Sequence, residues 1–313
     1  MRILITGGAG FIGSHVADQC LAKGWEVCVV DDLSSGNRDN VPGDARFEEI
    51  DIRNADKVEK VIADFKPNYI SHQAAQASVA VSVREPQLDA EINILGGLNI
   101  LSSAAKNDVE RILFASTGGA IYGEVPDGTR AGLDTPPNPM SPYAASKFAF
   151  EKYLECFKTE HGLDYRVLRY ANVYGPRQDP HGEAGVVAIF MNRFLAGEGI
   201  QINARKEAGD PGCVRDYVFI DDVAGANIAS MENKITQPVI NICTGEETDT
   251  LTLATTIEES LGVTVDKTFT PLRPGDVERS VLDPCDIEKA LGGTVSLSDG
   301  IAKTAEWFKA RNA

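Results

Sequence analysis

The chain has 313 residues, enough for a large core, and 43% hydrophobic with 24% charged residues is typical of a globular protein. Its formal net charge of -16 argues against nucleic acid or an anionic membrane surface as the main partner. The six cysteines form no CxxC pair and the four histidines add no metal-ligand spacing, so we expect reduced thiols, a cytoplasmic location and no metal.

The first strong pattern is a short apolar run followed at once by glycines. Residues 3–6 predict a strand, and Gly7, Gly10 and Gly13 permit a tight turn and close approach of the backbone to a pyrophosphate, before a helix expected over 14–23. The amides and dipole at the start of that helix favour an anion. The next strand, 26–30, runs into Asp31, where a carboxylate would bind an adenosine ribose and repel a 2′-phosphate. This order predicts a dinucleotide site and favours NAD over NADP, although Arg38 nearby leaves NADP open.

Strands and helices then alternate along the chain. Apolar runs at 46–50, 69–72, 111–115, 165–170 and 239–242 predict strands, and periodic segments at 55–65, 86–106 and 143–160 predict helices. Such alternation predicts an α/β fold with a doubly wound parallel sheet. After residue 176 the pattern is less regular, with helices expected at 185–196, 251–261 and 298–310.

Tyr143 and Lys147 are four residues apart on a predicted helix, so their side chains share one face. A phenol titrates near pH ~10, and a neighbouring cation lowers that pKa, which makes the pair a candidate acid/base catalyst. Tyr-x-x-x-Lys also occurs by chance on solvated helices. Ser116 and Thr117 follow the strand at 111–115, at the end where such sheets bind ligands, but serine and threonine there are often only turn formers.

These residues belong to a larger set of motifs. The chain resembles the extended short-chain dehydrogenase/reductase family over nearly its whole length and, within it, the UDP-glucose 4-epimerases of bacterial or archaeal type. The resemblance implies a Rossmann-type domain (1–172, with a returning segment about 217–245), a smaller nucleotide-sugar-binding α/β domain (173–216 and 246–313), tightly bound NAD, and a homodimer formed through the helices near 86–106 and 143–160. The matching segments lie at 6–15, 30–36, 72–79, 116–123, 143–147, 169–175, 214–217 and 273–276.

The resemblance also implies roles for single residues. Tyr143 would take the proton from the sugar 4-hydroxyl, Lys147 would hold the nicotinamide ribose and lower the pKa of Tyr143, and Ser116 or Thr117 would hydrogen-bond the reacting oxygen. The 4-keto sugar would turn over before reduction, so the reaction is redox-neutral and NAD stays bound. Cofactor contacts are expected at Gly7, Gly10, Phe11, Ile12, Gly13, Asp31, Asp32, Asp51, Ile52, Ala74, Ala75, Gln76, Asn93, Ser116, Tyr143, Lys147 and Tyr170. Substrate contacts are expected at Thr117, Tyr143, Asn172, Val187, Arg215, Arg273 and Asp276.

The chain differs from some members of the family at Gly118, at residues 203–212 and at Ser280. Gly118 stands where some relatives carry a third hydroxyl residue, and residues 203–212 are longer and more charged than the turn common in the family. Ser280 aligns roughly where a bulky residue restricts the sugar pocket of some relatives, so a UDP-GlcNAc/UDP-GalNAc activity is a further expectation. The alternatives are a UDP-glucuronate 4-epimerase or decarboxylase, an enzyme like dTDP-glucose 4,6-dehydratase (disfavoured by Gly118 and Gly119 in place of its acid pair), and a non-catalytic NAD-binding regulator.

Overall fold

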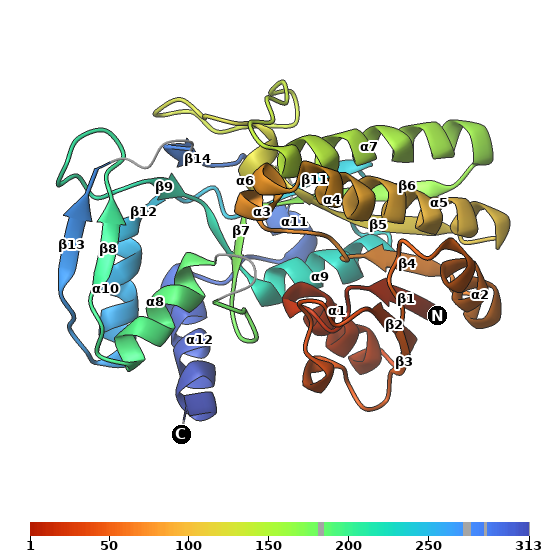
Figure 1. Ribbon diagram of the computed structural model, residues 1–313, viewed down its shortest axis with the longest axis horizontal. Coiled ribbons are helices and arrows are strands. Elements are labelled where there is room, and N and C mark those ends of the chain that lie inside the picture. Colours follow the sequence, from red (N-terminus) through yellow and green to blue (C-terminus); the bar gives the residue numbers. More distant parts are fainter. Residues whose placement is uncertain (181–184, 272–276, 285–286, 313) are drawn as a thin grey trace.

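A seven-stranded parallel sheet forms the centre of the larger part of the molecule (Figure 1). The structure is a computed structural model that describes residues 1–180, 185–271, 277–284 and 287–312. The strand order is β3-β2-β1-β4-β5-β6-β11, and every neighbouring pair is parallel. The direction of progression reverses between β1 and β4, so the C-terminal ends of these strands border the switch point where doubly wound sheets bind ligands. The strands are β1 (Arg2–Thr6), β2 (Glu26–Asp31), β3 (Arg46–Glu49), β4 (Tyr69–His72), β5 (Arg111–Thr117), β6 (Asp164–Tyr170) and β11 (Val239–Ile242).

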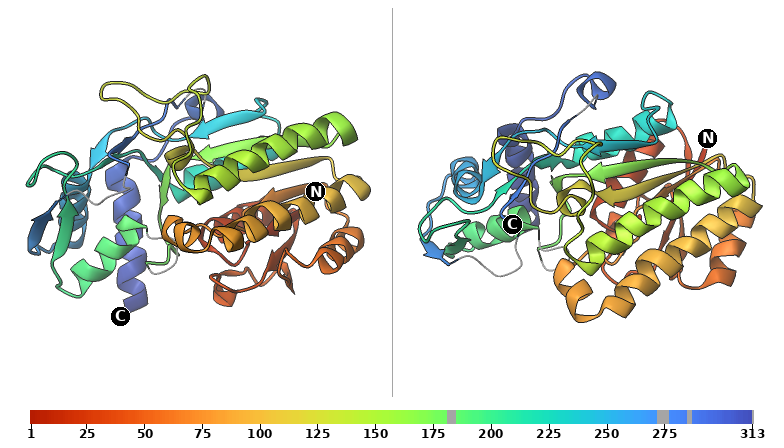
Figure 2. Two further views of the ribbon diagram at one scale, coloured as in Figure 1. Left: turned by 45° about the horizontal axis from the view of Figure 1, so that its top comes forward. Right: turned by 90° about the horizontal axis from the view of Figure 1, so that it is seen from above.

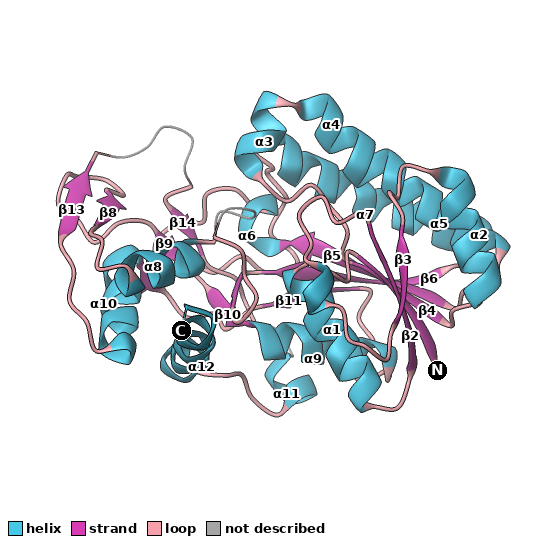
Figure 3. Ribbon diagram, turned by 60° about the horizontal axis from the view of Figure 1, so that its bottom comes forward, coloured by secondary structure: helices cyan, strands magenta, loops and turns pink. Residues whose placement is uncertain are grey.

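Helices cover both faces of this sheet, because its strands carry apolar side chains on both faces. Ile3, Leu4 and Ile5 of β1 are all fully buried, which is the pattern of a parallel strand covered on both sides. Figure 3 shows the two helical layers, and Figure 2 shows α5 and α7 side by side. One layer contains α2 (Ala55–Phe65), α5 (Gly97–Lys106) and α7 (Pro142–His161), and the other contains α1 (Phe11–Ala22) and α9 (Ile220–Met231). The predicted doubly wound sheet is confirmed, including its return through β11.

Some element boundaries differ from those predicted. Helix α1 begins at Phe11 rather than at residue 14, because Gly10 already has the extended backbone of a cap residue. Strand β5 continues through Ser116 and Thr117, so both hydroxyls belong to the strand itself. The helix predicted from Pro86 to about residue 106 consists of α4 (Pro86–Ala90), the π-helix η2 (Glu91–Gly96) and α5.

The rest of the chain builds a smaller α/β part beside the carboxyl ends of the sheet (Figure 1). Its short strands pair as β10 with β7, β12-β9-β14, and β13 with β8. Helices α8, α10 and α12 pack around them over a further apolar core. None of the helices in the described ranges is both long and apolar enough to cross a membrane. The remaining elements are η1 (Arg38–Asn40), α3 (Val79–Arg84), α6 (Gly118–Ile121), β7 (Asn172–Tyr174), α8 (Val186–Leu195), β8 (Ile200–Asn203), β9 (Val214–Arg215), β10 (Tyr217–Phe219), β12 (Thr248–Asp249), α10 (Thr250–Leu261), β13 (Lys267–Thr270), β14 (Arg279–Ser280), α11 (Ile287–Leu291) and α12 (Leu297–Asn312).

Candidate active site

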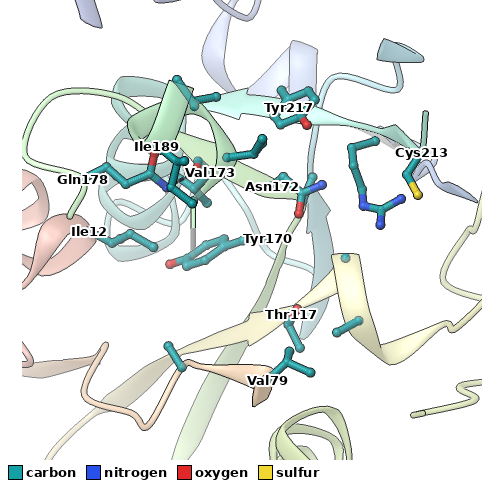
Figure 4. A pocket seen from close by; sticks show the side chains of 18 of the residues that line it. Ile12, Val79, Thr117, Tyr170, Asn172, Val173, Gln178, Ile189, Cys213 and Tyr217 are labelled. Atoms are coloured by element: carbon teal, nitrogen blue, oxygen red, sulfur yellow. Dashed lines mark hydrogen bonds between the residues drawn. The ribbon is translucent and has the colours of Figure 1, made fainter. Parts of the chain in front are cut away.

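A cavity of about 850 Å³ opens at the C-terminal ends of β5 and β6, between the large sheet and the smaller part. Figure 4 shows side chains from both parts around it. The cavity therefore brings together residues that are far apart in the sequence. Predicted site residues that line it are Ile12, Ala75, Ser116, Thr117, Tyr143, Lys147, Tyr170, Asn172, Val187 and Arg215.

Helix α7 supplies the tyrosine and the lysine. It begins cleanly because the Ser141 side chain accepts a hydrogen bond from the Ala144 amide, with proline at the first helical position. Lys147 is 3% exposed, and its Nζ donates to the carbonyl oxygen of Ala115 at 3.0 Å. The same Nζ lies 6.0 Å from the centroid of the Tyr143 ring. The phenol and the ammonium group thus lie on one wall of the cavity, as the spacing predicted.

Three further ionisable side chains in or beside the cavity, His72, Tyr170 and Tyr217, stay neutral near pH 7. Burial and the nearby Lys147 cation lower the pKa of His72 to about 3, and the His72 ring nitrogen Nδ1 is 2.7 Å from the Thr6 hydroxyl. Burial raises the pKa of Tyr170 to about 12, and the pKa of Tyr217 is also raised by burial. Tyr170 and Tyr217 are therefore poor bases, which favours Tyr143 among the three tyrosines that line the cavity.

Ser116 and Thr117 end β5 in different surroundings. The Ser116 hydroxyl donates to the Glu151 carboxylate at 2.6 Å, whereas the described residues give the Thr117 hydroxyl no hydrogen bond. Thr117 faces the cavity in Figure 4. At the next position a Cβ on Gly118 would lie 2.3 Å from Cδ1 of Leu282. Position 118, where some relatives carry a third hydroxyl, thus has no side chain here, and Leu282 packs against its backbone.

The glycine-rich loop after β1 fits a dinucleotide. Gly7 has a positive φ of 69°, and a Cβ on Gly13 would lie 2.2 Å from the Gly7 carbonyl oxygen, so only glycine allows this tight turn. Gly10 caps α1 without a side-chain hydrogen bond from the described residues, which leaves first-turn amides for an anion. The Asp31 carboxylate accepts hydrogen bonds from the amides of Ala9 and Leu33, both at 2.9 Å. Burial raises the pKa of Asp31 and these bonds lower it, with burial prevailing.

The other predicted cofactor residues do not line the cavity. Asp32 accepts from the Ser34 hydroxyl, and Asp51 holds the Arg53 guanidinium, whose hydrogen bonds lower the pKa of Asp51. Asn93 is 3% exposed and bonds both the amide and the carbonyl group of Gln76. It therefore anchors the loop after β4 to the helical layer. The predicted cofactor residues away from the cavity are Gly7, Gly10, Phe11, Gly13, Asp31, Asp32, Asp51, Ile52, Ala74, Gln76 and Asn93.

Among the predicted substrate residues, Arg215 is held by backbone carbonyl groups. Its guanidinium donates to the carbonyl oxygens of Val214 at 2.9 Å and Val277 at 2.5 Å. Ser280 is 2% exposed and donates to the carbonyl oxygen of Gly119 at 3.1 Å. Arg273 and Asp276 lie outside the described residues.

The unusual stretch at 203–212 forms a compact turn on the cavity rim. The Asp210 carboxylate accepts from the amides of Arg205, Lys206 and Gly212. The side chains of Arg205 and Lys206 both bind Asp127, in the loop after α6. The charged residues noted in the sequence thus link the 203–212 turn to the loop that contains Asp127.

Sequence reasoning missed much of the wall contributed by the smaller part. Some of these residues lie on regular elements, such as Arg193 on α8 and Thr250 at the start of α10, but the sequence does not show which of their side chains face the cavity. They include Gln178, Arg193, Gln201, Asn203, Cys213 and Thr250.

The sequence and the fold are similar to those of known epimerases. Residues 3–243 match the model of the NAD dependent epimerase/dehydratase family. A UDP-glucose 4-epimerase of Mycolicibacterium smegmatis is 42% identical over 315 residues, covering 99% of both chains. The solved UDP-glucose 4-epimerase of Thermus thermophilus in complex with NAD is 50% identical with a TM-score of 0.93, covering 99% of both chains. That of Thermotoga maritima with UDP-glucose is 47% identical with a TM-score of 0.94, covering 100% of both.

Proposed function

Because the chain belongs to the NAD-dependent epimerase/dehydratase family, we propose that it interconverts the C4 epimers of a UDP-hexose, UDP-glucose and UDP-galactose, with NAD that stays bound. The observation that carries this proposal is the single cavity shared by Tyr143 and Lys147 from α7, Thr117 from β5, and Asn172 and Arg215 from the other side. Residues 1–172 with 217–245 hold NAD, and the remaining residues hold the UDP-sugar.

The residues present fit the cofactor. The turn has no room for a Cβ at Gly7 or Gly13, and such a close turn lets the backbone approach a pyrophosphate. The Asp31 carboxylate ends β2 where a ribose would bind and would repel a 2′-phosphate. When bound, NAD would supply the redox chemistry, oxidising the sugar at C4 and reducing the keto sugar again.

The chain itself moves the proton and holds the sugar nucleotide. Tyr143 takes the proton of the 4-hydroxyl as C4 is oxidised and returns it after the keto sugar has turned over. The Lys147 ammonium favours the phenolate form of Tyr143 and binds the nicotinamide ribose. A hydroxyl from Ser116 or Thr117 binds the reacting oxygen. Arg215 presents its planar guanidinium to the diphosphate, a group that arginine binds well.

We also infer that the pocket admits an N-acetyl group at C2 of the sugar. Ser280 is small, and its hydroxyl is bonded to Gly119, which lines the cavity. Ser280→Tyr should abolish turnover of UDP-GalNAc and spare UDP-galactose. Equal loss on both sugars would contradict this reading.

A second copy of the chain is the partner we infer. Apolar side chains are exposed on α3, on η2 and in the loop just before α7, and both α3 and η2 contact α7. Val83 is 62%, Leu95 57% and Met140 61% exposed, and such a patch is typical of a protein interface. A cytoplasmic location fits the five described cysteines, which are all free thiols.

The deciding experiment uses purified protein without added NAD. It is incubated separately with UDP-galactose, UDP-GalNAc and UDP-glucuronate, and the anomeric protons are followed by NMR. Conversion of UDP-galactose to UDP-glucose is expected. Turnover of UDP-glucuronate alone would move the protein to uronate chemistry, and no turnover even with added NAD would overturn the proposal.

A further inference from the structure

A buried polar network adjoins the cavity and joins four elements of the large sheet and its helical layer. Ser116 on β5, Glu151 on α7 and Arg169 on β6 are 3%, 2% and 5% exposed. Arg169 donates to both carboxylate oxygens of Glu151, at 3.0 and 2.6 Å, and the Ser116 hydroxyl donates to Oε1 at 2.6 Å. Arg169 also donates to the Tyr122 hydroxyl at 2.7 Å, and Tyr122 donates to Asn241 on β11 at 3.1 Å. The charges of Glu151 and Arg169 are thus paired within the core.

The network assigns the single proton of Ser116. A serine hydroxyl has one O–H donor and two lone pairs, and the Glu151 carboxylate accepts that donor. Toward the cavity, Ser116 can therefore only accept a hydrogen bond. A sugar oxygen that is becoming a carbonyl oxygen needs a donor, and the Thr117 hydroxyl lines the same cavity.

Glu151 also fixes the position of α7 along β5. Tyr143, Lys147 and Glu151 follow one another at intervals of four residues and so share one face of the helix. Lys147 binds the carbonyl group of Ala115 and Glu151 binds the hydroxyl of Ser116, so successive helix turns bind successive strand residues. The position of Tyr143 relative to Thr117 depends on both contacts.

We propose that Glu151 is a positioning residue for the C4 chemistry: it binds the proton of Ser116, fixes α7 on β5, and leaves Thr117 as the hydroxyl that donates to the reacting oxygen. This inference rests on the proposed function and names the hydroxyl that the proposed function leaves open.

The first test compares Ser116→Ala with Thr117→Val, two variants that leave the Glu151–Arg169 pair in place. The kcat for UDP-galactose should fall by about tenfold for Ser116→Ala, because the contact that positions α7 on β5 is lost while the donor hydroxyl of Thr117 stays. It should fall about 100-fold or more for Thr117→Val, the range for loss of one oxyanion donor. An equal loss in both variants, or a larger loss in Ser116→Ala, would overturn the proposal.

The second test is a rescue that a merely structural role could not give. In Glu151→Gln, the amide oxygen can keep the Nη2 donor of Arg169 only if the NH₂ group takes the Oε1 position, where Arg169 Nε loses its acceptor. The NH₂ group then lies beside Ser116 and can donate to its hydroxyl, which frees the serine proton. Glu151→Gln added to Thr117→Val should therefore raise kcat about tenfold above Thr117→Val alone. No gain would overturn the proposal. If Glu151→Gln fails to fold, the first comparison still decides.

Wild-type turnover is measured first, because its absence would contradict the proposed function itself. In that case crystal structures of wild type and Glu151→Gln test the inference separately. The Ser116 hydroxyl should face residue 151 in the first structure and the cavity in the second. A wild-type Ser116 turned into the cavity would contradict the inference.

Discussion

The close packing of Leu282 against Gly118 predicts how substitutions at these two positions change the free energy of unfolding. A Cβ at Gly118 would lie 2.3 Å from Cδ1 of Leu282 and 3.1 Å from the carbonyl oxygen of Arg169. Carbon atoms normally approach to about 3.5–4.0 Å. In Gly118→Ala, the fully buried Leu282 side chain must therefore move by more than about 1 Å from its packed position.

The expected energies follow from this geometry. Overpacking a core costs about 1–3 kcal/mol, so Gly118→Ala should lower the free energy of unfolding by that amount. Leu282→Ala should lower it by about 2–5 kcal/mol through lost burial and a cavity. In the double variant the alanine methyl at 118 enters the space that the leucine leaves. The combined loss should be smaller than the sum of the single losses by about 1–3 kcal/mol.

Urea unfolding followed by circular dichroism measures all three variants. Gly225→Ala on α9 is the matched control, because its Cβ would lie 3.5 Å from the nearest atom, Cδ2 of Leu291, which is an ordinary contact. That variant should be neutral or stabilised by up to about 1 kcal/mol, as alanine favours a helix over glycine. Strictly additive losses at 118 and 282 would refute the reasoning.

Tyr143→Phe should keep its bound NAD, measured by absorbance after denaturation, and lose at least about 100-fold in epimerisation, because a general acid/base is removed; unchanged turnover would exclude Tyr143 from the mechanism. Burial raises the pKa of Asp164, but hydrogen bonds from Lys158 and Arg111 outweigh it and hold that pKa at about 2, below the ordinary value of about 3.9. The Asp164 carboxylate therefore stabilises the fold above about pH 4 and loses this contribution as the pH falls toward about 2, so Asp164→Asn should flatten the acid decline in the free energy of unfolding; an unaltered decline would contradict this assignment. Leu95→Glu should convert the expected dimer to a monomer in light scattering, whereas Leu133→Glu, 41% exposed outside the patch, should not; a dimer that survives Leu95→Glu would place the interface elsewhere.

The regular half of the fold was predictable because its signals are local. β4 and β11 have the bounds that their apolar runs predicted, and α2 begins and ends where its amphipathic pattern does. The start of α1 was placed three residues late, since a glycine-rich turn conceals the first helical turn. The π-helix between α4 and α5 left no such signal, since its apolar residues follow the same pattern as those of the α-helices beside it.

The candidate site was predictable only in part, for the same reason. Tyr143 and Lys147 were found because both lie on one helix at a fixed spacing. Glu151 continues that spacing, but its partner Arg169 lies on β6, and nothing local in the sequence links the two residues. The cavity wall around Gln178 and Thr250 is assembled by the folded chain from separate short segments.

The place of β11 in the sheet has a consequence for how the chain is made. β6 pairs on one side with β5 and on the other with β11, whose residues follow about seventy positions later. At a synthesis rate of about 5–20 residues per second, β6 leaves the ribosome roughly 4–14 s before its second neighbour exists. During that interval a growing chain presents an unpaired, apolar strand edge, the feature through which chains aggregate. Slower translation between residues 171 and 239 should therefore lower the soluble yield without altering the finished protein.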